Sequence, residues 1–273
     1  MKAIIIAICI SVVYSSGLYP EDPVENDFIS KNFENIEAFN VSVVTANSFP
    51  FVVSLQIYQD ATHINNCAGV IVSTVAVLTT ATCISGTSRV EIIAGVHNRD
   101  MVEQYQQRRV ILPTNYVVHN LYNSSKYAYN VAMLRTPGNP FILNAFVQQA
   151  RLPIDFTGES FTGEVARTLS WGRVSEQIAS SSTLRQLFNS VIANSVCAPY
   201  YTEGTVNDNT ICVQTTAANP NFCSTSVLTV NRPGDIRPVL VGLTKFLPPS
   251  CGVARPYGFV RITSFLTWIS MYS

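Results

Sequence analysis

The sequence predicts an all-β fold of the sandwich or barrel type. Short runs rich in valine, isoleucine and phenylalanine recur along most of the 273 residues, and Asn, Gly, Ser or Pro residues separate them. Hydrophobic residues make up 47% of the chain and charged residues only 12%, against roughly 25% charged residues in an average globular protein. A chain of this composition can bury a sizeable core, which excludes disorder over most of its length.

The predicted strands are short and closely spaced. β-branched residues are enriched in them, as expected for side chains that pack on a pleated sheet. In chain order the strands cover residues 51–55, 69–72, 75–78, 90–93, 239–243 and 259–262. Near the end of the chain, Phe265, Trp268 and Ile269 recur at near-helical spacing, which predicts a short terminal helix over residues 264–271.

Residues 1–17 are predicted to be a secretory signal peptide. Lys2 precedes an apolar stretch over residues 3–13, and residues 15–17 supply the small side chains that signal peptidase requires. The stretch is shorter than the ~20 residues of a membrane span, and it lacks the caps and the periodicity of a buried helix. We therefore expect a secreted, extracellular protein without a membrane span.

The use of cysteine agrees with an oxidising compartment. One of the seven cysteines, Cys9, lies in the signal peptide, and seven minus one leaves an even six. An even number in a secreted chain predicts disulfides, although six cysteines allow fifteen pairings. No Cys-x-x-Cys motif or Cys/His cluster indicates a metal, and no motif indicates a cofactor, so we expect neither.

Residues 18–37 form an acidic pre-segment ahead of a domain at residues 38–273. Lys31 is the only basic residue in the segment, and Pro20 and Pro23 disfavour a helix. Its acidic residues are Glu21, Asp22, Glu25, Asp27, Glu34 and Glu37. Over the whole chain 17 basic residues balance 17 acidic ones, so the basic excess of a nucleic-acid-binding protein is missing and no nucleic acid partner is expected.

Five sequence blocks occur in an order that a known family shares. They are residues 49–55 (P-[WY]-Q-V-S-L in the family), 67–83 (C-G-G-S-L-I to V-L-T-A-A-H-C), 130–135 (D-I-A-L-L-R), 170–173 (around G-W-G) and 258–263 with 268–269 (the closing strand and helix). On these blocks the chain resembles the chymotrypsin-like serine proteases of the trypsin family, and most closely the insect members. The resemblance implies two six-stranded antiparallel β-barrels with a cleft between them. It also implies a barrel boundary near residues 145–155 and a short C-terminal helix.

The same resemblance implies the disulfide pairing. The family joins successive cysteines at the matching positions, so Cys67 is expected to pair with Cys83, Cys197 with Cys212, and Cys223 with Cys251. Counting alone leaves the pairing open, so this expectation depends on position in the family pattern.

Two of the family's three catalytic positions hold residues of different chemistry. In the family a serine attacks the carbonyl, a histidine accepts the proton of that serine, and an aspartate orients the histidine. Here Thr82 stands at the histidine position and Asn130 at the aspartate position. Threonine cannot accept a proton near neutral pH. Replacing the aspartate with asparagine alone costs about 10⁴ in turnover.

The nucleophile block is shortened as well. The family pattern C-x-G-D-S-G-G-P-L is replaced by residues 223–228, Cys-Ser-Thr-Ser-Val-Leu, which lack the glycines. Those glycines let the main chain turn so that two N–H groups form an oxyanion hole. Ser226 is the residue nearest the nucleophile position, with Ser224 beside it. We expect neither serine to have a base or a formed oxyanion hole.

Two further family features are replaced. The substrate-binding strand S-[WF]-G appears as Lys245, Phe246 and Leu247. A leucine in place of the glycine would crowd the main chain of a bound peptide. The activation sequence I-V-G-G appears as residues 38–41 with no Arg or Lys directly ahead of it, and the aspartate that would pair with the new amino terminus is missing, with Thr225 nearest.

Two acceptor motifs for N-glycosylation are present. Asn40 begins Asn-Val-Ser and Asn123 begins Asn-Ser-Ser. Both motifs are expected in surface loops of a secreted chain.

Together these features predict a catalytically inactive serine protease homologue that acts by binding or regulating an extracellular protein. An alternative is a structural, storage or luminal protein that keeps the scaffold because it is stable and soluble. A residual serine endopeptidase is disfavoured because no proton acceptor aligns with the serine block.

Overall fold

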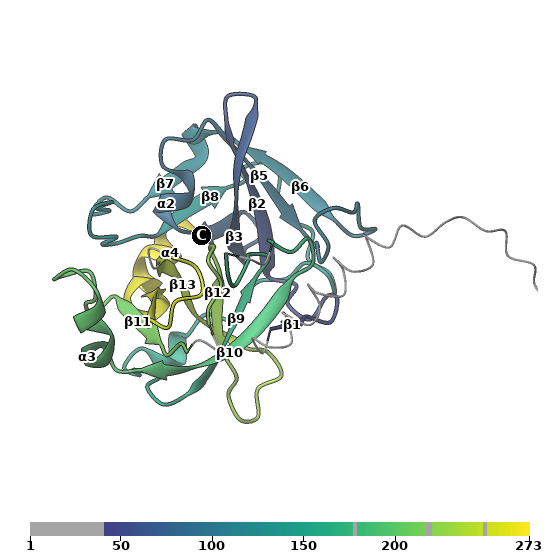
Figure 1. Ribbon diagram of the computed structural model, residues 1–273. Helices are drawn as coiled ribbons and strands as arrows, with labels where there is room; N and C mark the ends of the chain where they lie inside the picture. The colour runs from purple at the N-terminus through teal and green to yellow at the C-terminus, as the bar shows by residue number, and fades with distance from the viewer. Residues whose placement is uncertain (1–40, 177–178, 217–219, 248–249) are drawn as a thin grey trace, which may run out of the picture.

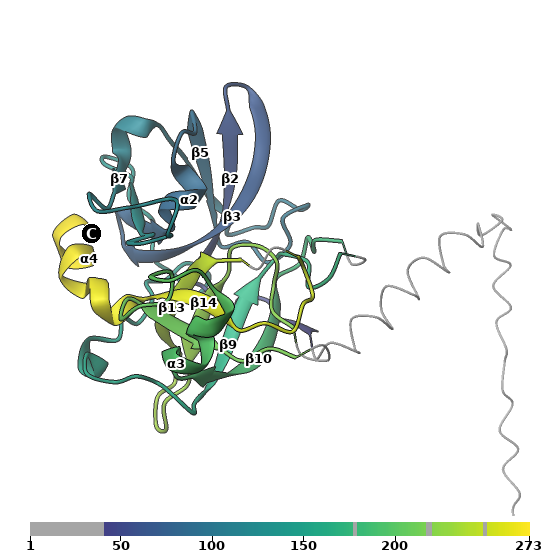
Figure 2. The same ribbon diagram turned by 60° about the vertical axis from the view of Figure 1, so that its left-hand side comes forward.

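The computed structural model describes residues 41–176, 179–216, 220–247 and 250–273. Figures 1 and 2 show two β-barrels, one above the other, with a short helix at the end of the chain. The predicted all-β fold of two antiparallel barrels with a short C-terminal helix is therefore confirmed. The predicted signal peptide, the acidic pre-segment and the acceptor residue Asn40 lie outside the described residues.

The first barrel is an antiparallel sheet with the strand order β6-β5-β2-β3-β4-β8-β7. Its strands are β2 (Val52–Gln59), β3 (Thr62–Ser73), β4 (Ala76–Thr79), β5 (Arg89–Ala94), β6 (Gln107–Ile111), β7 (Tyr116–Val118) and β8 (Ala132–Arg135). The resemblance implies six strands, and the structure has seven. Pro113 opens a 3-10 turn (Pro113–Asn115) that separates β6 from β7, and β6 pairs with β5 whereas β7 pairs with β8.

The second barrel is an antiparallel sheet with the strand order β1-β10-β11-β14-β13-β12-β9, and a further pairing of β9 with β10 closes it. Its strands are β1 (Ser42–Val43), β9 (Val165–Ser170), β10 (Arg185–Ile192), β11 (Thr210–Val213), β12 (Val227–Val230), β13 (Val239–Phe246) and β14 (Tyr257–Arg261). Here the seventh strand is the two-residue β1, which pairs with β10 at its edge. The predicted boundary at residues 145–155 falls in the connection between β8 and β9.

One apolar cluster joins the two barrels. It takes buried side chains from both sheets, including Leu78 on β4, Leu169 on β9 and Val227 on β12. The terminal helix α4 (Leu266–Tyr272) adds to it through the buried Ile269. This helix and the 3-10 turn before it follow the second barrel in the chain. They nevertheless contact the first barrel: the rings of Phe265 and Trp268 lie 5.6 and 5.5 Å from the ring of His119, measured between centroids. The walls of the cleft between the barrels are thus held in fixed relation.

No helix among the described residues is both long and apolar enough to cross a membrane. The longest α-helix described, α4, has 7 residues.

Candidate functional site

Thr82 and Asn130 lie side by side because two neighbouring strands end and begin there. Strand β4 pairs with β8 in antiparallel register, with Thr79 opposite Ala132. Thr82 follows β4 in the short helix α2 (Ala81–Ile84), and Asn130 precedes β8. The structure therefore brings together the two residues that the sequence resemblance assigns to the histidine and aspartate positions.

The polar groups of this pair are occupied by one another and by the main chain. The side-chain oxygen of Asn130 accepts hydrogen bonds from the main-chain N–H of Thr82 at 2.9 Å and from the Thr82 hydroxyl at 3.3 Å. The amide nitrogen of Asn130 donates to the main-chain oxygen of Lys245 at 2.9 Å. Only 1% of Asn130 is exposed. Neither side chain is a base near neutral pH, so the pair offers no proton acceptor.

The serines of the shortened block point elsewhere. Ser226 is buried, its N–H donates to the Thr244 hydroxyl at 2.9 Å, and the two hydroxyl oxygens lie 2.7 Å apart. The hydroxyl of Ser224 lies 2.9 Å from that of Ser170. Thr225, between them, accepts a hydrogen bond from the N–H of Ala68 in the first barrel at 2.7 Å. The structure brings neither serine into hydrogen-bonding contact with Thr82 or Asn130.

Phe246, which the sequence resemblance assigns to the family's substrate strand, forms part of the wall of the cleft. Its ring is buried, with an exposed fraction of 3%, and lies 4.3 Å from the ring of Tyr201. A Cβ built on Gly258 would overlap the Phe246 ring, so the ring occupies the space that a side chain at position 258 would need. Leu247 is 39% exposed and faces the cleft beside it.

A mainly apolar cavity of about 300 Å³ opens beside Thr82; we refer to it as the apolar cavity. Tyr127 lines it from the first barrel with a φ of 50°, in the left-handed region that bulky residues rarely adopt. Its lining residues are Asn65, Cys67, Thr82, Cys83, Tyr127, Thr225, Thr244, Lys245, Phe246 and Leu247.

Lys245 was expected only as part of the substrate strand, and the structure shows a buried cation. Its exposed fraction is 2%, and its ammonium donates to the main-chain oxygen of Thr205 at 2.8 Å and to the hydroxyl of Thr210 at 2.7 Å. A third hydrogen bond reaches the side-chain oxygen of Asn207 at 3.2 Å. Burial lowers the pKa of Lys245 to about 8. The sequence signal is a lysine inside a strand whose other residues, apart from Thr244, are apolar or glycine.

The disulfides hold the segments that carry the site. The structure pairs Cys67 with Cys83, Cys197 with Cys212, and Cys223 with Cys251, as the family resemblance implies, at Cα–Cα distances of 6.2, 6.3 and 5.4 Å. The first of these bonds ties β3 to the helix that carries Thr82. The third anchors the shortened serine block.

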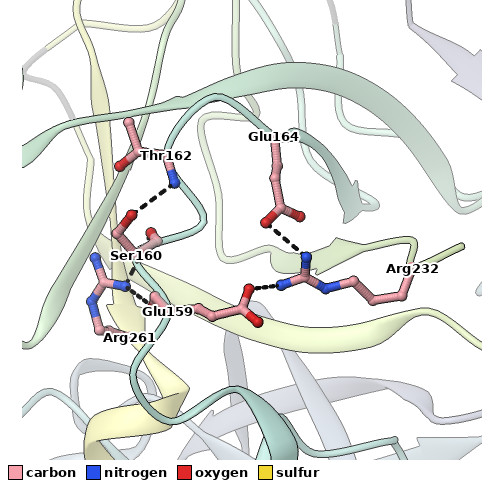
Figure 3. Close-up of polar contacts among 6 residues, drawn as sticks. All are labelled: Glu159, Ser160, Thr162, Glu164, Arg232 and Arg261. Atoms are coloured by element: carbon pink, nitrogen blue, oxygen red, sulfur yellow. Dashed lines mark hydrogen bonds and ion pairs between the residues drawn. The ribbon is translucent and has the colours of Figure 1, made fainter.

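A group of charged contacts around Arg232 lies away from the cleft. Figure 3 shows the guanidinium of Arg232 between the carboxylates of Glu159 and Glu164, the latter at 3.0 Å. Arg261 donates to the main-chain oxygens of Glu159 and Ser160, and so holds the same loop. Burial raises the pKa of Glu164, and the charge of Arg232 opposes that shift. The group ties the loop that carries Glu159 and Ser160 to Arg232 and to the end of β14.

A metal centre is not apparent in the part of the chain that the structure describes: it contains no group of three or more His, Cys, Asp or Glu side chains placed to hold an ion. Asn123, the other predicted glycosylation acceptor, is exposed, and its side-chain oxygen accepts from the Ser125 hydroxyl at 2.7 Å.

Known proteins resemble the chain in both sequence and fold. Brachyurin from Leptuca pugilator is 30% identical over 205 residues, which cover 74% of this chain and 85% of that protein. Collagenase from Hypoderma lineatum is 27% identical over 228 residues, covering 81% of each chain.

Two solved structures show the same fold. The structure of HL collagenase aligns with a TM-score of 0.70 at 24% identity, covering 85% of this chain and 97% of that one. The structure of GrC aligns with a TM-score of 0.73 at 20% identity, covering 85% of this chain and 98% of that one. The family model described as Trypsin matches residues 39–269. With that match spanning most of its length, the chain belongs to the trypsin family of chymotrypsin-fold serine proteases.

Proposed function

We propose that this protein is a secreted trypsin-family homologue that binds an extracellular protein through its cleft and does not cut it. The observation that carries the proposal is the closed hydrogen-bonding of Thr82 with Asn130, to which no serine contributes. A serine hydroxyl is a poor nucleophile at neutral pH unless an adjacent base takes its proton. Neither Thr82 nor Asn130 can do so.

Without an oxyanion hole, turnover would be lower still. In an active serine protease, removing one donor of that hole costs about 10²–10³ in turnover. Here the main-chain N–H of Ser226 is already bonded to Thr244, inside the second barrel. Brachyurin and the collagenase carry names of proteases, and the proposal separates this chain from them in chemistry while keeping their scaffold.

The features that remain in the cleft suit the binding of a protein segment. The apolar cavity presents Leu247 and Tyr127 to solvent, at 39% and 37% exposure. Tyr127 keeps a left-handed backbone conformation, and such strain is concentrated at ligand-binding surfaces. Tyrosine is among the residues that most often anchor a protein partner, and Leu247 adds apolar surface beside it.

Secretion is part of the proposal. It is supported by the predicted signal peptide and by three disulfides, which persist in oxidising compartments. The exposed Asn123 would carry a glycan there.

The catalytic half of the proposal is tested by labelling the purified secreted protein with a fluorophosphonate, beside an active member of the family. We expect no labelling. Labelling that is lost in Ser224→Ala or Ser226→Ala would overturn this half and return the chain to the serine endopeptidases.

The binding half is tested by placing a photo-cross-linking amino acid at position 247 in the secreted protein and irradiating it in its native fluid. The matched control carries the same group at position 236, where Ile236 is 98% exposed and does not line the apolar cavity. A discrete partner captured from position 247 and not from position 236 supports the proposal. Equal or no capture at both positions would favour a structural or storage protein.

A further inference from the structure

A second cavity, lined mainly by polar residues, lies next to the apolar cavity. We refer to it as the polar cavity; its volume is about 180 Å³. The two cavities share Asn65, Cys67 and Thr225 in their walls, so they are neighbouring parts of one cleft. The other lining residues of the polar cavity are Asn66, Ala68, Arg99, Ser170, Trp171, Gly172, Arg173, Ser180, Cys223 and Ser224.

We propose that the polar cavity binds the carboxylate of an aspartate or glutamate side chain in an extended segment of the protein partner, while a large apolar side chain of the same segment enters the apolar cavity. The inference rests on the proposed function and names the kind of segment that the cleft takes.

The residues that line the polar cavity carry positive charge. They include two arginines, Arg99 and Arg173, and no aspartate or glutamate. Arg173 forms an ion pair with Glu176 at 2.8 Å, outside the lining, and this compensates its charge. Arg99 is therefore the cation left for a ligand, which favours a group with one negative charge over a phosphate dianion.

The Arg99 guanidinium has a main-chain and an aromatic neighbour but forms no ion pair with a carboxylate among the described residues. It donates to the main-chain oxygen of Ser181 at 2.8 Å and lies 5.8 Å from the ring of Trp171. Glu103, in the same connection between β5 and β6, accepts the N–H groups of His97 and Asn98 at 2.7 and 2.8 Å instead. Asp100 follows Arg99 in the chain and is exposed.

Burial lowers the pKa of Arg99, whereas the negative charge of Asp100 raises it. The net lowering agrees with the geometry, in which the guanidinium is partly removed from water. A partly desolvated guanidinium that forms no ion pair gains more from a carboxylate than a fully hydrated one does.

The Ser224 hydroxyl is a neutral donor that can join Arg99 in binding a carboxylate. Among the described residues, the hydrogen-bonding partners of the Ser224 hydroxyl are the Ser170 hydroxyl at 2.9 Å and, more weakly, the Thr225 oxygen at 3.4 Å. The Ser170 hydroxyl already donates to the oxygen of Thr225 and accepts from the N–H of Gly172. Since the single proton of Ser170 goes to Thr225, Ser224 is the donor in the 2.9 Å contact, and its proton can leave that hydroxyl for a carboxylate, which is the stronger acceptor. A carboxylate held by one arginine and one hydroxyl would form short charge-assisted hydrogen bonds.

The test is fluorescence anisotropy with the secreted full chain and a set of fluorescein-labelled, C-amidated peptides. Each peptide carries one Phe and one Glu, in either order, separated by zero to three glycines; the matched set has Gln in place of Glu. We expect at least one Glu peptide to bind about tenfold more tightly than its Gln counterpart, the equivalent of one charge-assisted contact. Arg99→Gln should remove the difference. Arg135→Gln, at an exposed position of β8, should leave it unchanged.

Sodium acetate as competitor distinguishes a free carboxylate ligand from a peptide one. Displacement of the peptide only at concentrations far above that of the Glu peptide supports a segment that uses both cavities. Displacement by acetate at comparable concentration would contradict it, because the apolar side chain would then contribute nothing. If Arg99→Gln lowers the melting temperature, Arg99→Lys supplies the second variant, and it should keep part of the preference for Glu.

Equal binding of Glu and Gln peptides, no binding of any peptide, or an unchanged preference in Arg99→Gln would each overturn the inference. The proposed function would survive these results, because it is judged separately by fluorophosphonate labelling and by cross-linking at position 247.

Discussion

Asn130 connects Thr82 of the first barrel to Lys245 of the second: its side-chain oxygen accepts the Thr82 N–H at 2.9 Å, and its amide nitrogen donates to the Lys245 main-chain oxygen at 2.9 Å. An amide can accept on one side and donate on the other, whereas an ionised carboxylate can only accept. The asparagine is therefore the residue that this particular surrounding requires.

Asn130→Asp should destabilise the protein at neutral pH. The ionised carboxylate introduced by this substitution would face the oxygen of Lys245 in a buried site, at a cost of about 1–3 kcal/mol. The folded state would raise the pKa of that carboxyl above its unfolded value, so the cost should fade as the pH falls through the folded pKa, where the protonated acid can donate again. Urea unfolding of both proteins at pH 7 and pH 4 measures this. An equal difference at both pH values would contradict the assignment.

Introducing the family's histidine and aspartate at positions 82 and 130 should not produce a protease. In Thr82→His combined with Asn130→Asp, a base would be present, but Ser226 would remain bonded to Thr244 in the barrel interior. We expect no fluorophosphonate labelling and no peptide hydrolysis above background. The single variants serve as controls. Labelling of the double variant that Ser224→Ala abolishes would show that the shortened block can deliver a nucleophile.

Lys245 should make stability rise with pH in a defined window. Its folded pKa is about 8, below the ordinary value of 10.5, so between these values the unfolded chain binds more protons than the folded one. The free energy of unfolding should therefore increase from pH 8 towards pH 10, by a few kcal/mol at most at about 1.4 kcal/mol per pKa unit.

Lys245→Met is the variant for this test, because a methionine does not titrate. The difference between the unfolding free energies of the wild type and the variant, followed by urea from pH 7 to pH 10, should change along that window. Burial raises the pKa of Tyr201 to about 12 in both proteins, and this contribution cancels in the difference. A pH-independent difference would place the charge of Lys245 in contact with water.

Gly258→Ala should be costly only while Phe246 is present. The added methyl group would overlap the Phe246 ring, and overpacking of this kind costs about 1–3 kcal/mol. Phe246→Ala alone leaves a cavity and should cost about 3–5 kcal/mol. In the double variant the methyl group has room, so the combined cost should be less than the sum of the two single costs. Thermal unfolding of all four proteins completes the cycle, and strict additivity would mean that the two positions do not touch.

Arg232→Gln should lower stability modestly and in a salt-dependent way. Arg232 pairs with Glu159 and Glu164, but all three side chains reach solvent, and such pairs are worth about 0–1 kcal/mol each. We expect the loss in low-salt buffer to shrink in 1 M NaCl, where charges are screened over about 3 Å. Arg108→Gln, which removes the single exposed pair with Glu91, is the matched control and should cost less.

The fold was largely predictable because strand propensity and family blocks agree. Residues 69–72 and 90–93 fall inside β3 and β5, and residues 239–243 fall inside β13. The break between β6 and β7 was not predicted; it falls at Pro113, which opens a 3-10 turn. The register shift between Thr244 and Phe246 is a local irregularity of the same kind, and no residue pattern announces it.

The site was predictable in position and not in detail. The sequence blocks predict the positions of Thr82 and Asn130, because Thr82 follows β4, Asn130 precedes β8, and these two strands pair. Ser226 was placed only by proximity, since a shortened loop has no family template, and its hydroxyl bonds to Thr244. The burial of Lys245 and the unpaired charge of Arg99 depend on residues 35 to 82 positions away in the chain, which no local pattern records.

The apolar cluster that the two barrels share affects which substitutions the protein can accept during evolution. Leu78, Leu169 and Val227 bind the two barrels into one cooperative unit, and calorimetry should accordingly record a single transition. None of these side chains lines either cavity. Substitutions in the cleft can therefore alter its chemistry without loosening the barrels, so one folded body can accommodate different cleft chemistries over evolutionary time.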